Sequence, residues 1–202
     1  MYSPEFDALL SALAAIFRDE GRDEAARTAQ ALLITPAPEV IGKREACSFD
    51  PLIRDVLSTS DMAAARALLA AQDMIPWGTN PVAGQMTDDA AAICAVAELM
   101  GPHGPIPAPD LRLGLLFQRP DSYYPLHNHD ADETYVILAG EALWTAGEDV
   151  RLRGAGEVVH HPSLMPHAFR AGPKGFVALY RWSGDINAES YAFLDDPAVI
   201  AV

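Results

Sequence analysis

Cysteine and long hydrophobic runs are both scarce in this chain. Only two of its 202 residues are cysteines, Cys47 and Cys94, and they lie far apart in the sequence. A disulfide scaffold and a thiolate metal site are therefore excluded, and we expect both cysteines to be buried small apolar residues. The apolar runs are too short to cross a bilayer, although hydrophobic residues make up 50% of the chain, which is enough for a globular core.

Positive charge is also scarce, because 14 lysines and arginines stand against 28 aspartates and glutamates, for a formal net charge of −14. Such a chain repels nucleic acid and anionic lipid unless it has a basic patch, and its arginines are scattered, so we expect neither partner. Acidic runs such as Asp195-Asp196 are expected to be solvated. The first residues do not have the pattern of a secretory signal, so we expect a cytoplasmic location by default. We expect the protein to be a monomer or a homodimer.

The first half of the chain has helical periodicity. In residues 4–17 the apolar side chains recur at a spacing of three or four, and Ser3 before a proline predicts a capped helix start. Four more segments, most of them alanine-rich, predict helices: residues 23–33, 51–57, 60–72 and 88–100. Thr87 or Asp88 is the expected N-cap of the last of these. None contains a catalytic motif, so we expect these helices to pack on another unit.

A stretch rich in proline and glycine, residues 101–110, follows the helical half. After it come short segments of strand character: residues 111–118, 134–139, 142–145, 157–160, 168–171 and 176–182. Many short strands within a hundred residues predict a compact antiparallel barrel or sandwich. We therefore expect a mainly β protein in which residues 1–105 form a helical segment that packs on a barrel of residues 106–202.

Four residues of the second half suit a metal ion: His127, His129, Glu133 and His167. In an extended strand alternate residues share a face, so His127 and His129 are expected to point into the barrel together. The residues between them and Glu133 allow a turn that returns Glu133 to the same side, and Tyr135 has the same parity. We expect His167 to reach this cavity from another strand.

Three neutral imidazoles and one carboxylate suit one divalent transition metal, such as Fe(II), Zn, Mn or Ni, without choosing among them. The neighbouring His160 and His161 face opposite ways if they lie in a strand, so at most one of them can approach the cavity. His103 lies in the proline-rich stretch and is expected to be exposed. Trp144 is expected to pack inside the barrel.

The spacing of the candidate ligands resembles the cupin family. The pattern His127-x-His129-x3-Glu133-x6-Gly140 matches the first cupin motif from its first histidine onward, and Gly156-x5-Pro162-x4-His167 matches most of the second. The resemblance covers roughly the C-terminal half and implies a cupin barrel, which is a double-stranded β-helix or jelly roll.

Three positions depart from the cupin motifs. Asp121 and Leu164 stand where glycine is expected, and Ala171 stands where asparagine is common. These are structural positions, so we expect the metal ligands to be retained even if the local turns differ.

A narrower resemblance is carried by the residues that flank both motifs. The chain is similar to the cupin dimethylsulfoniopropionate lyases in four runs: Tyr124-Pro125-Leu126-His127, Glu133-Thr134-Tyr135, His161-Pro162-Ser163-Leu164-Met165-Pro166-His167 and Leu179-Tyr180-Arg181-Trp182-Ser183-Gly184-Asp185. A helical segment before the barrel agrees with that group. The resemblance implies a carbon–sulfur lyase that cleaves dimethylsulfoniopropionate, a small zwitterionic sulfonium compound, to dimethyl sulfide and acrylate.

The same resemblance implies roles for aromatic residues. A β-elimination needs a base for the proton beside the substrate carboxylate, and Tyr135 would be that base because a metal next to a phenol stabilises its phenolate. The metal would bind the carboxylate, and Tyr124 is a second candidate for binding or proton transfer. Aromatic faces suit the apolar sulfonium cation, so Trp182, Tyr124 and Tyr123 are candidate substrate-binding residues.

Two other functions fit the same residues. A metal-dependent cupin dioxygenase would use the open coordination positions for dioxygen, and it would consume oxygen where a lyase does not. A non-catalytic cupin that binds a small molecule would hold metal and ligand without turnover, and Tyr135 would then be only part of the wall.

Overall fold

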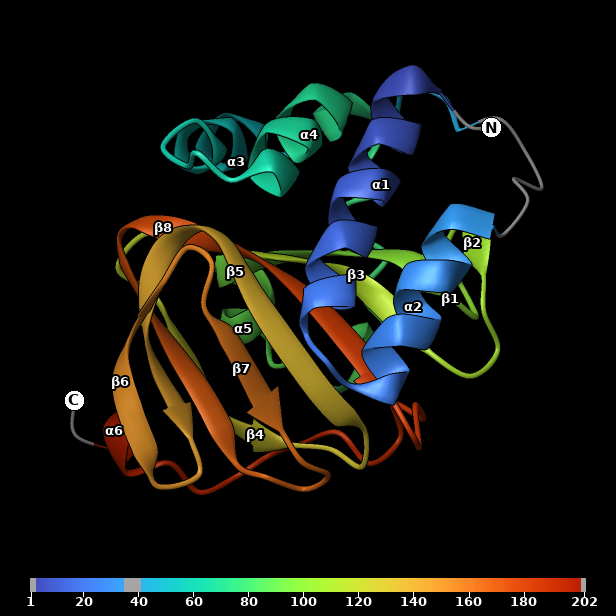
Figure 1. Cartoon of the computed structure of the whole chain (residues 1–202). Coiled ribbons are helices and arrows are strands. Elements are labelled where there is room, and N and C mark those ends of the chain that lie inside the picture. Colours follow the sequence, from blue (N-terminus) through green and yellow to red (C-terminus); the bar gives the residue numbers. More distant parts are fainter. Residues whose placement is uncertain (1–2, 35–40, 201–202) are drawn as a thin grey trace.

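A curved β-sheet forms the centre of the molecule, and helices cover one of its faces (Figure 1). The computed structural model describes residues 3–34 and 41–200, with the backbone alone for residues 199–200. The helices are α1 (Pro4–Asp19), α2 (Asp23–Ile34), α3 (Asp50–Leu57), α4 (Ala63–Ala71), α5 (Asp88–Ile93) and α6 (Pro197–Ile200), with 3-10 helices at Gln72–Met74 and Ala83–Gln85. The strands are β1 (Cys94–Gly101), β2 (Ile106–Pro107), β3 (Arg112–Gln118), β4 (Tyr123–Asn128), β5 (Asp132–Ala146), β6 (Asp149–Gly154), β7 (Val158–His161), β8 (His167–Ser183) and β9 (Ala192–Phe193).

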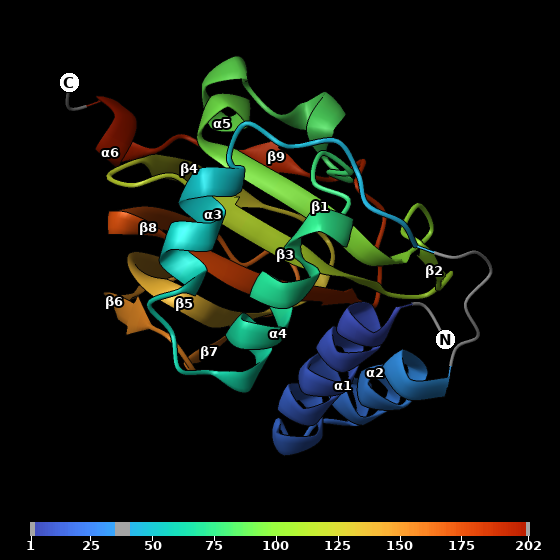
Figure 2. The same ribbon diagram turned by 90° about the horizontal axis from the view of Figure 1, so that it is seen from above.

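The N-terminal helices lie where the sequence predicts them. Ser3 Oγ accepts a hydrogen bond from the backbone N–H of Phe6 (3.1 Å), which caps the first turn of α1. The predicted helices at residues 23–33, 51–57 and 60–72 correspond to α2, α3 and α4 within a few residues. Helix α3 packs on β8 and β5, and α1 packs on α2 and α4 (Figure 2). One apolar cluster contains buried residues of these helices and of the sheet, so the two share a core.

The predicted helix at residues 88–100 is wrong in its second half. Thr87 Oγ1 caps α5 by accepting the backbone N–H of Ala90 (3.2 Å), but the helix ends at Ile93 and the chain continues as β1, antiparallel to β3. All residues of β1 except Val96 are buried. Apart from Glu98 this run is apolar, and such a run fits a buried helix and a strand that is covered on both faces equally well. Only the pairing with β3 decides between the two.

Strands β5 and β8 are antiparallel partners over most of their length and form much of the barrel. Each joins two segments that the sequence predicts as separate strands: residues 134–139 and 142–145 in β5, and residues 168–171 and 176–182 in β8. Gly140, with φ of 77°, lies at a bulge that bends β5. Because of this bend, β5 pairs with β7 near its start and with β6 near its end.

The stretch at residues 101–110 connects β1 to β3, two neighbours in the same sheet. The sheet therefore includes a strand from before the predicted boundary, and the division of the chain into residues 1–105 and 106–202 stays a prediction. Cys94 in β1 is buried, as expected, and burial raises the pKa of its thiol to about 12. The expectation for Cys47 is wrong, because its side chain is only half-buried.

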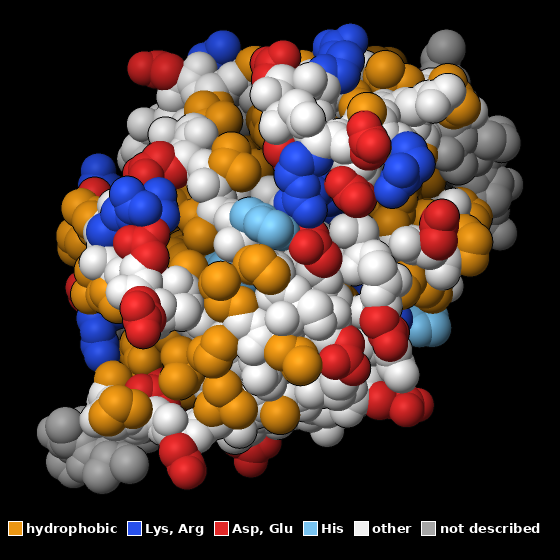
Figure 3. All heavy atoms as spheres, turned by 60° about the horizontal axis from the view of Figure 1, so that its bottom comes forward, with side chains coloured by type: hydrophobic (Ala, Val, Ile, Leu, Met, Phe, Trp, Pro, Cys, Tyr) orange, Lys and Arg blue, Asp and Glu red, His pale blue; other side chains and the backbone are white. Residues whose placement is uncertain are grey.

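Charged side chains of both signs share the surface. On the face in Figure 3, basic side chains lie beside acidic ones rather than in a patch of their own. His103 is exposed, as expected. In the part of the chain that the structure describes, no helix is long and apolar enough to span a membrane.

Candidate active site

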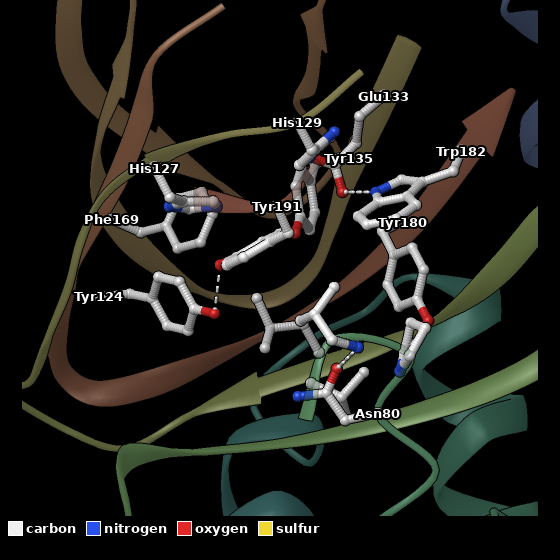
Figure 4. A pocket seen from close by; sticks show the side chains of 14 residues that line it. Asn80, Tyr124, His127, His129, Glu133, Tyr135, Phe169, Tyr180, Trp182 and Tyr191 are labelled. Carbon is white, nitrogen blue, oxygen red and sulfur yellow. Dashed lines mark hydrogen bonds and ion pairs between the residues drawn. The ribbon is translucent and has the colours of Figure 1, made fainter. Parts of the chain in front are cut away.

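A cavity inside the barrel brings most of the candidate site residues together (Figure 4). Its volume is about 40 Å³, and strands β4, β5 and β8 supply half of the residues in its wall. The residues that line it are Asn80, Pro81, Val82, Val96, Leu116, Tyr124, His127, His129, Glu133, Tyr135, Phe169, Tyr180, Trp182 and Tyr191. A second apolar cluster, separate from the one under the helices, surrounds this cavity.

Strand register places these side chains next to one another. Glu133 of β5 lies opposite Trp182 of β8 on one side and opposite His161 of β7 on the other. Two residues further along β5, Tyr135 lies opposite Tyr180. Because the side-chain period of a strand is two, all these side chains point into the barrel.

Tyr180 in turn lies opposite Gly114 of β3. A Cβ atom at position 114 would lie 2.6 Å from Cζ of Tyr180 and 2.2 Å from the carbonyl oxygen of Ala97, so only glycine leaves room for this ring.

Three imidazole nitrogens surround one oxygen of Glu133. Nε2 of His129, Nε2 of His167 and Nδ1 of His161 lie 3.1, 3.2 and 3.5 Å from Oε2 of Glu133. All four side chains are buried: His129 is 2% exposed, and the other three are 1% exposed. Burial alone would raise the pKa of the Glu133 carboxyl, but these histidines hold it well below its ordinary value.

Hydrogen bonds to the rings show which nitrogens have free lone pairs. Nδ1 of His167 lies 2.8 Å from the carbonyl oxygen of Met165, which can only accept, so Nδ1 carries a proton and, in the neutral ring that a metal ligand needs, Nε2 has the lone pair. That Nε2 faces the Glu133 carboxylate without a hydrogen bond. Two lone-pair atoms at this distance repel each other unless a cation lies between them, so these residues fit a divalent metal ion.

Among the residues that the structure describes, His129, Glu133 and His167 form a group that could hold such an ion, because their ligand atoms lie within 4.8 Å of one another. The fourth predicted ligand, His127, is outside this group. It lies opposite His167 in the β4–β8 pairing, with ring centroids 4.0 Å apart, and it also lines the cavity. Its Nδ1 donates to the carbonyl oxygen of Pro125 (2.8 Å). Burial and the neighbouring His167 keep the pKa of His127 well below its ordinary value.

His161 has the opposite tautomer. The indole N–H of Trp144 can only donate, and it lies 3.0 Å from Nε2 of His161, so the proton of His161 is on Nδ1, which faces Glu133. Burial lowers the pKa of His161 to about 4, so the ring is neutral. His160 instead lies on the outer side and pairs with Asp132 (2.8 Å). The prediction that at most one of the two histidines approaches the cavity is confirmed, as is the packing of Trp144 inside the barrel.

Tyr135 is buried in the wall of this cavity, with its ring 5.5 Å from that of Phe169 and 5.0 Å from that of Trp144. Burial, followed by the negative charge of Glu133, raises the pKa of the Tyr135 phenol well above its ordinary value. The protein alone therefore keeps this hydroxyl protonated, and only a nearby cation can reverse that tendency.

Tyr123 is not brought to the cavity, so the structure gives no support to its predicted contact with substrate. Its ring lies under the guanidinium of Arg170, and its hydroxyl donates to Oδ2 of Asp196 (2.8 Å). The expectation that Asp195-Asp196 is solvated is wrong for Asp196, which is buried and also accepts the backbone N–H of Leu126 (2.8 Å).

Sequence analysis missed several residues that line the cavity, above all Tyr191. This tyrosine belongs to the segment after β8, where no periodicity or motif marks it, and its hydroxyl lies 2.6 Å from that of Tyr124. Tyr180 and Phe169 are in predicted strands, and their parity with Trp182 and His167 was the signal that could have found them. Asn80, from the loop before α5, had no such signal.

Both positions where a cupin glycine is replaced have positive φ. Asp121 has φ of 53° and Leu164 has φ of 63°. This region is strained for residues with a Cβ atom. The turn at Leu164 contacts the site directly, because the backbone N–H of Leu164 donates to the carbonyl oxygen of His129 (2.9 Å). The backbone conformation that glycine favours is thus kept without glycine.

The sheet and its buried histidine–glutamate cluster define the chain as a cupin barrel. Residues 22–178 match the family model described as "Dimethlysulfonioproprionate lyase". The chain therefore belongs to the dimethylsulfoniopropionate lyase family, and it is an enzyme of the carbon–sulfur lyase class.

Two curated relatives belong to the same group. The chain is 34% identical over 134 residues to dimethylsulfoniopropionate lyase DddQ of Ruegeria pomeroyi, a match that covers 66% of this chain and 67% of that protein. It is 33% identical over 92 residues to the putative dimethylsulfoniopropionate lyase DddL of Cereibacter sphaeroides, which covers 45% of this chain and only 38% of DddL.

Solved structures agree in fold. The crystal structure of DddQ from Ruegeria pomeroyi DSS-3 aligns with a TM-score of 0.64 at 27% identity, over 91% of this chain and 93% of that one. A structure described with the lyases RdDddP and RnDddQII aligns with a TM-score of 0.67 at 22% identity, over 95% and 98% of the two chains, and it supports the fold alone.

Proposed function

We propose that this protein cleaves dimethylsulfoniopropionate to dimethyl sulfide and acrylate by a metal-dependent β-elimination. The names of the relatives support the substrate. The observation that carries the mechanism is that Tyr135 lines the same cavity as His129 and Glu133, two of the three residues able to hold a divalent metal. The third, His167, lies directly behind them, with its Nε2 3.2 Å from Oε2 of Glu133. His127 stays a predicted fourth ligand at the edge of this group.

A divalent metal held by these residues would supply positive charge that binds the substrate carboxylate, acidifies the adjacent C–H bond and stabilises a phenolate. Hydrogen bonds within the protein already orient two of the candidate ligands. The backbone carbonyl of Met165 orients His167, and the Trp182 indole N–H donates to Oε1 of Glu133 (2.6 Å), which leaves Oε2 to face the histidines. Fixed ligands of this kind strengthen metal binding.

Tyr135 takes the proton in this proposal. In the phenolate form, its oxygen removes a proton from the carbon next to the substrate carboxylate, and the electron pair of that C–H bond forms the new C=C bond. The C–S bond breaks, and its electron pair leaves with sulfur as neutral dimethyl sulfide. Acrylate remains, and Tyr135 returns its proton to solvent before the next turnover. No oxidant is needed.

The aromatic wall suits the sulfonium end of the substrate. A sulfonium is a cation with an apolar surface, and aromatic faces stabilise it without the cost of desolvating a carboxylate partner. Trp182 and Tyr124 line the cavity and are both buried, at 4 and 5% exposure. They lie on opposite sides of it in Figure 4, so each can contact a different end of a short substrate.

The test is dimethyl sulfide release, measured by gas chromatography after the protein is reconstituted separately with Fe(II), Zn, Mn and Ni. We expect release with at least one metal, none from metal-free protein, and no oxygen uptake. Tyr135→Phe should keep its metal and lose turnover. Unchanged turnover in that variant would remove Tyr135 from the mechanism, and oxygen consumption would favour the dioxygenase.

Two further expectations from the sequence accompany this proposal. The cytoplasmic location and the monomeric or homodimeric state stay predictions. A protein that binds metal and acrylate but releases no dimethyl sulfide with any metal would instead be a non-catalytic binding protein.

A further inference from the structure

The C-terminal segment after β8 closes one side of the cavity. Strand β9 pairs with β4, so that Phe193 lies opposite His127 and Ala192 opposite Asn128. Ser190 Oγ accepts the backbone N–H of Asp130 (2.9 Å), which ties the segment to the turn that carries His129. The segment is therefore held on both sides of Tyr191.

This anchoring places the Tyr191 ring over two of the site histidines. Its centroid lies 5.1 Å from that of His127 and 5.9 Å from that of His129, and the Tyr191 and His129 rings are nearly parallel, at 14°. Tyr191 is 7% exposed, so its ring belongs to the cavity wall rather than to the surface. It thus lies next to the metal-capable group, the candidate ligands His129, Glu133 and His167, without being one of them.

The hydroxyls of Tyr191 and Tyr124 form a pair 2.6 Å apart. A phenol has an ordinary pKa of about 10, so each hydroxyl carries a hydrogen at neutral pH. A pair of hydroxyls has two hydrogens but needs only one for the bond between them. Among the hydrogen bonds of the described residues, neither hydroxyl has another partner, so one hydrogen is left for a ligand.

The carboxylate of the cavity is already engaged. Oε1 of Glu133 accepts the Trp182 indole N–H, and Oε2 faces the histidines. Of the two ends of the substrate, a sulfonium cannot accept a hydrogen bond, whereas a carboxylate oxygen accepts one strongly. The free hydrogen therefore selects the carboxylate end.

We propose that Tyr191 is a substrate-positioning residue, which with Tyr124 donates one hydrogen bond to the substrate carboxylate. This rests on the proposed function and deepens it. One carboxylate oxygen is held by the tyrosine pair while the other faces the metal-capable group, and the sulfonium is directed to the opposite side of the cavity, where Trp182 and Tyr180 lie (Figure 4). The ligand class is a short-chain carboxylate.

The test is Tyr191→Phe, which removes the hydroxyl and keeps the ring. A hydrogen bond made equally in the bound substrate and in the transition state changes KM and leaves kcat nearly alone, so we expect KM to rise about ten-fold with kcat within about two-fold. Acrylate binding to the metal-loaded protein, measured by calorimetry, should weaken by a similar factor. A merely structural role would instead lower metal content and melting temperature without this split.

Ser190→Ala is the matched control, because it removes an anchor of the same segment outside the cavity and leaves the hydroxyl pair intact. It should keep both KM and the acrylate affinity. If Tyr191→Phe fails to fold, Tyr124→Phe tests the pair from the β4 side, with the same loss of acrylate affinity expected. Unchanged KM and acrylate affinity in the folded, metal-loaded variant overturn the proposal. Acrylate binding is measured without turnover, so a wild-type protein that binds acrylate but releases no dimethyl sulfide contradicts the proposed function alone.

Discussion

Trp182 donates its indole N–H to Oε1 of Glu133 at 2.6 Å, across the β5–β8 pairing that makes the two residues cross-strand neighbours. The bond leaves the other carboxylate oxygen to the histidines. The sequence predicts that Trp182 contacts the sulfonium through its aromatic face. The structure indicates a second role, because its indole N–H also orients the candidate metal ligand Glu133.

This contact predicts that Trp182→Phe weakens metal binding. Phenylalanine keeps an aromatic face but cannot donate a hydrogen bond, and loss of such a partner lowers metal affinity about ten-fold or more. A competition titration of Zn against a chelator measures the change. Trp77→Phe is the matched control, since Trp77 lies outside this cavity and its indole N–H has no hydrogen-bond partner among the described residues. Wild-type metal affinity in Trp182→Phe, together with a raised KM, would leave Trp182 as an aromatic wall only.

A second prediction concerns the unequal roles of the site histidines. His129→Ala and His167→Ala should abolish bound metal, because each removes one of three converging ligands. His127→Ala should retain more metal than either, since its ring lies beside the group rather than in it. Elemental analysis after reconstitution gives the stoichiometry. Equal loss in all three variants would restore His127 as a full ligand, as the cupin motif implies.

A third prediction follows from the strained turn at Leu164. Its φ of 63° disfavours any residue with a Cβ atom, and its side chain is 53% exposed, so little packing is lost on removal. Leu164→Gly should raise the free energy of unfolding by about 0.5–1 kcal/mol. A residue with a Cβ atom loses about 1–2 kcal/mol in the left-handed conformation, and the greater entropy of glycine in the unfolded chain offsets part of this gain. Leu164→Ala keeps the Cβ atom and should show no gain in urea unfolding. A loss of stability in the glycine variant would speak against strain here.

A fourth prediction concerns acid and the C-terminal segment. Burial tends to raise the pKa of Asp196, but hydrogen bonds from the Leu126 N–H and the Tyr123 hydroxyl hold it below its ordinary value. A carboxyl with a lowered folded-state pKa stabilises the protein above the unfolded-state pKa, and this contribution is lost as the pH falls through the folded-state value. Asp196→Asn should therefore be less stable than wild type at neutral pH.

The stability difference between the two proteins should shrink below about pH 3.8, the range in which the Asp196 carboxyl gains its proton. Urea unfolding at several pH values measures it. A difference that stays constant with pH would mean that the carboxylate charge plays no part in anchoring the segment.

Much of the fold could be predicted because its signals are local. The periodicity of α1 and the cap at Ser3 depend on residues within one or two turns of each other. The change from α5 to β1 could not be predicted in the same way, since alanine-rich apolar residues up to Gly101 suit either structure until β3 pairs with them. Strand β9 has only two residues and is defined by its partner, β4.

By itself the sequence determined the types of the candidate metal ligands, their spacing and the parity of Tyr135, because these depend on a few neighbouring residues and on the period of a strand. The tertiary structure alone decided that Tyr123 anchors a segment while Tyr191 enters the cavity, and that Trp144 sets the tautomer of His161. Each of these contacts joins residues 17 to 73 positions apart. Such pairs are fixed by strand register and by the path of the chain over the barrel, which no local pattern records.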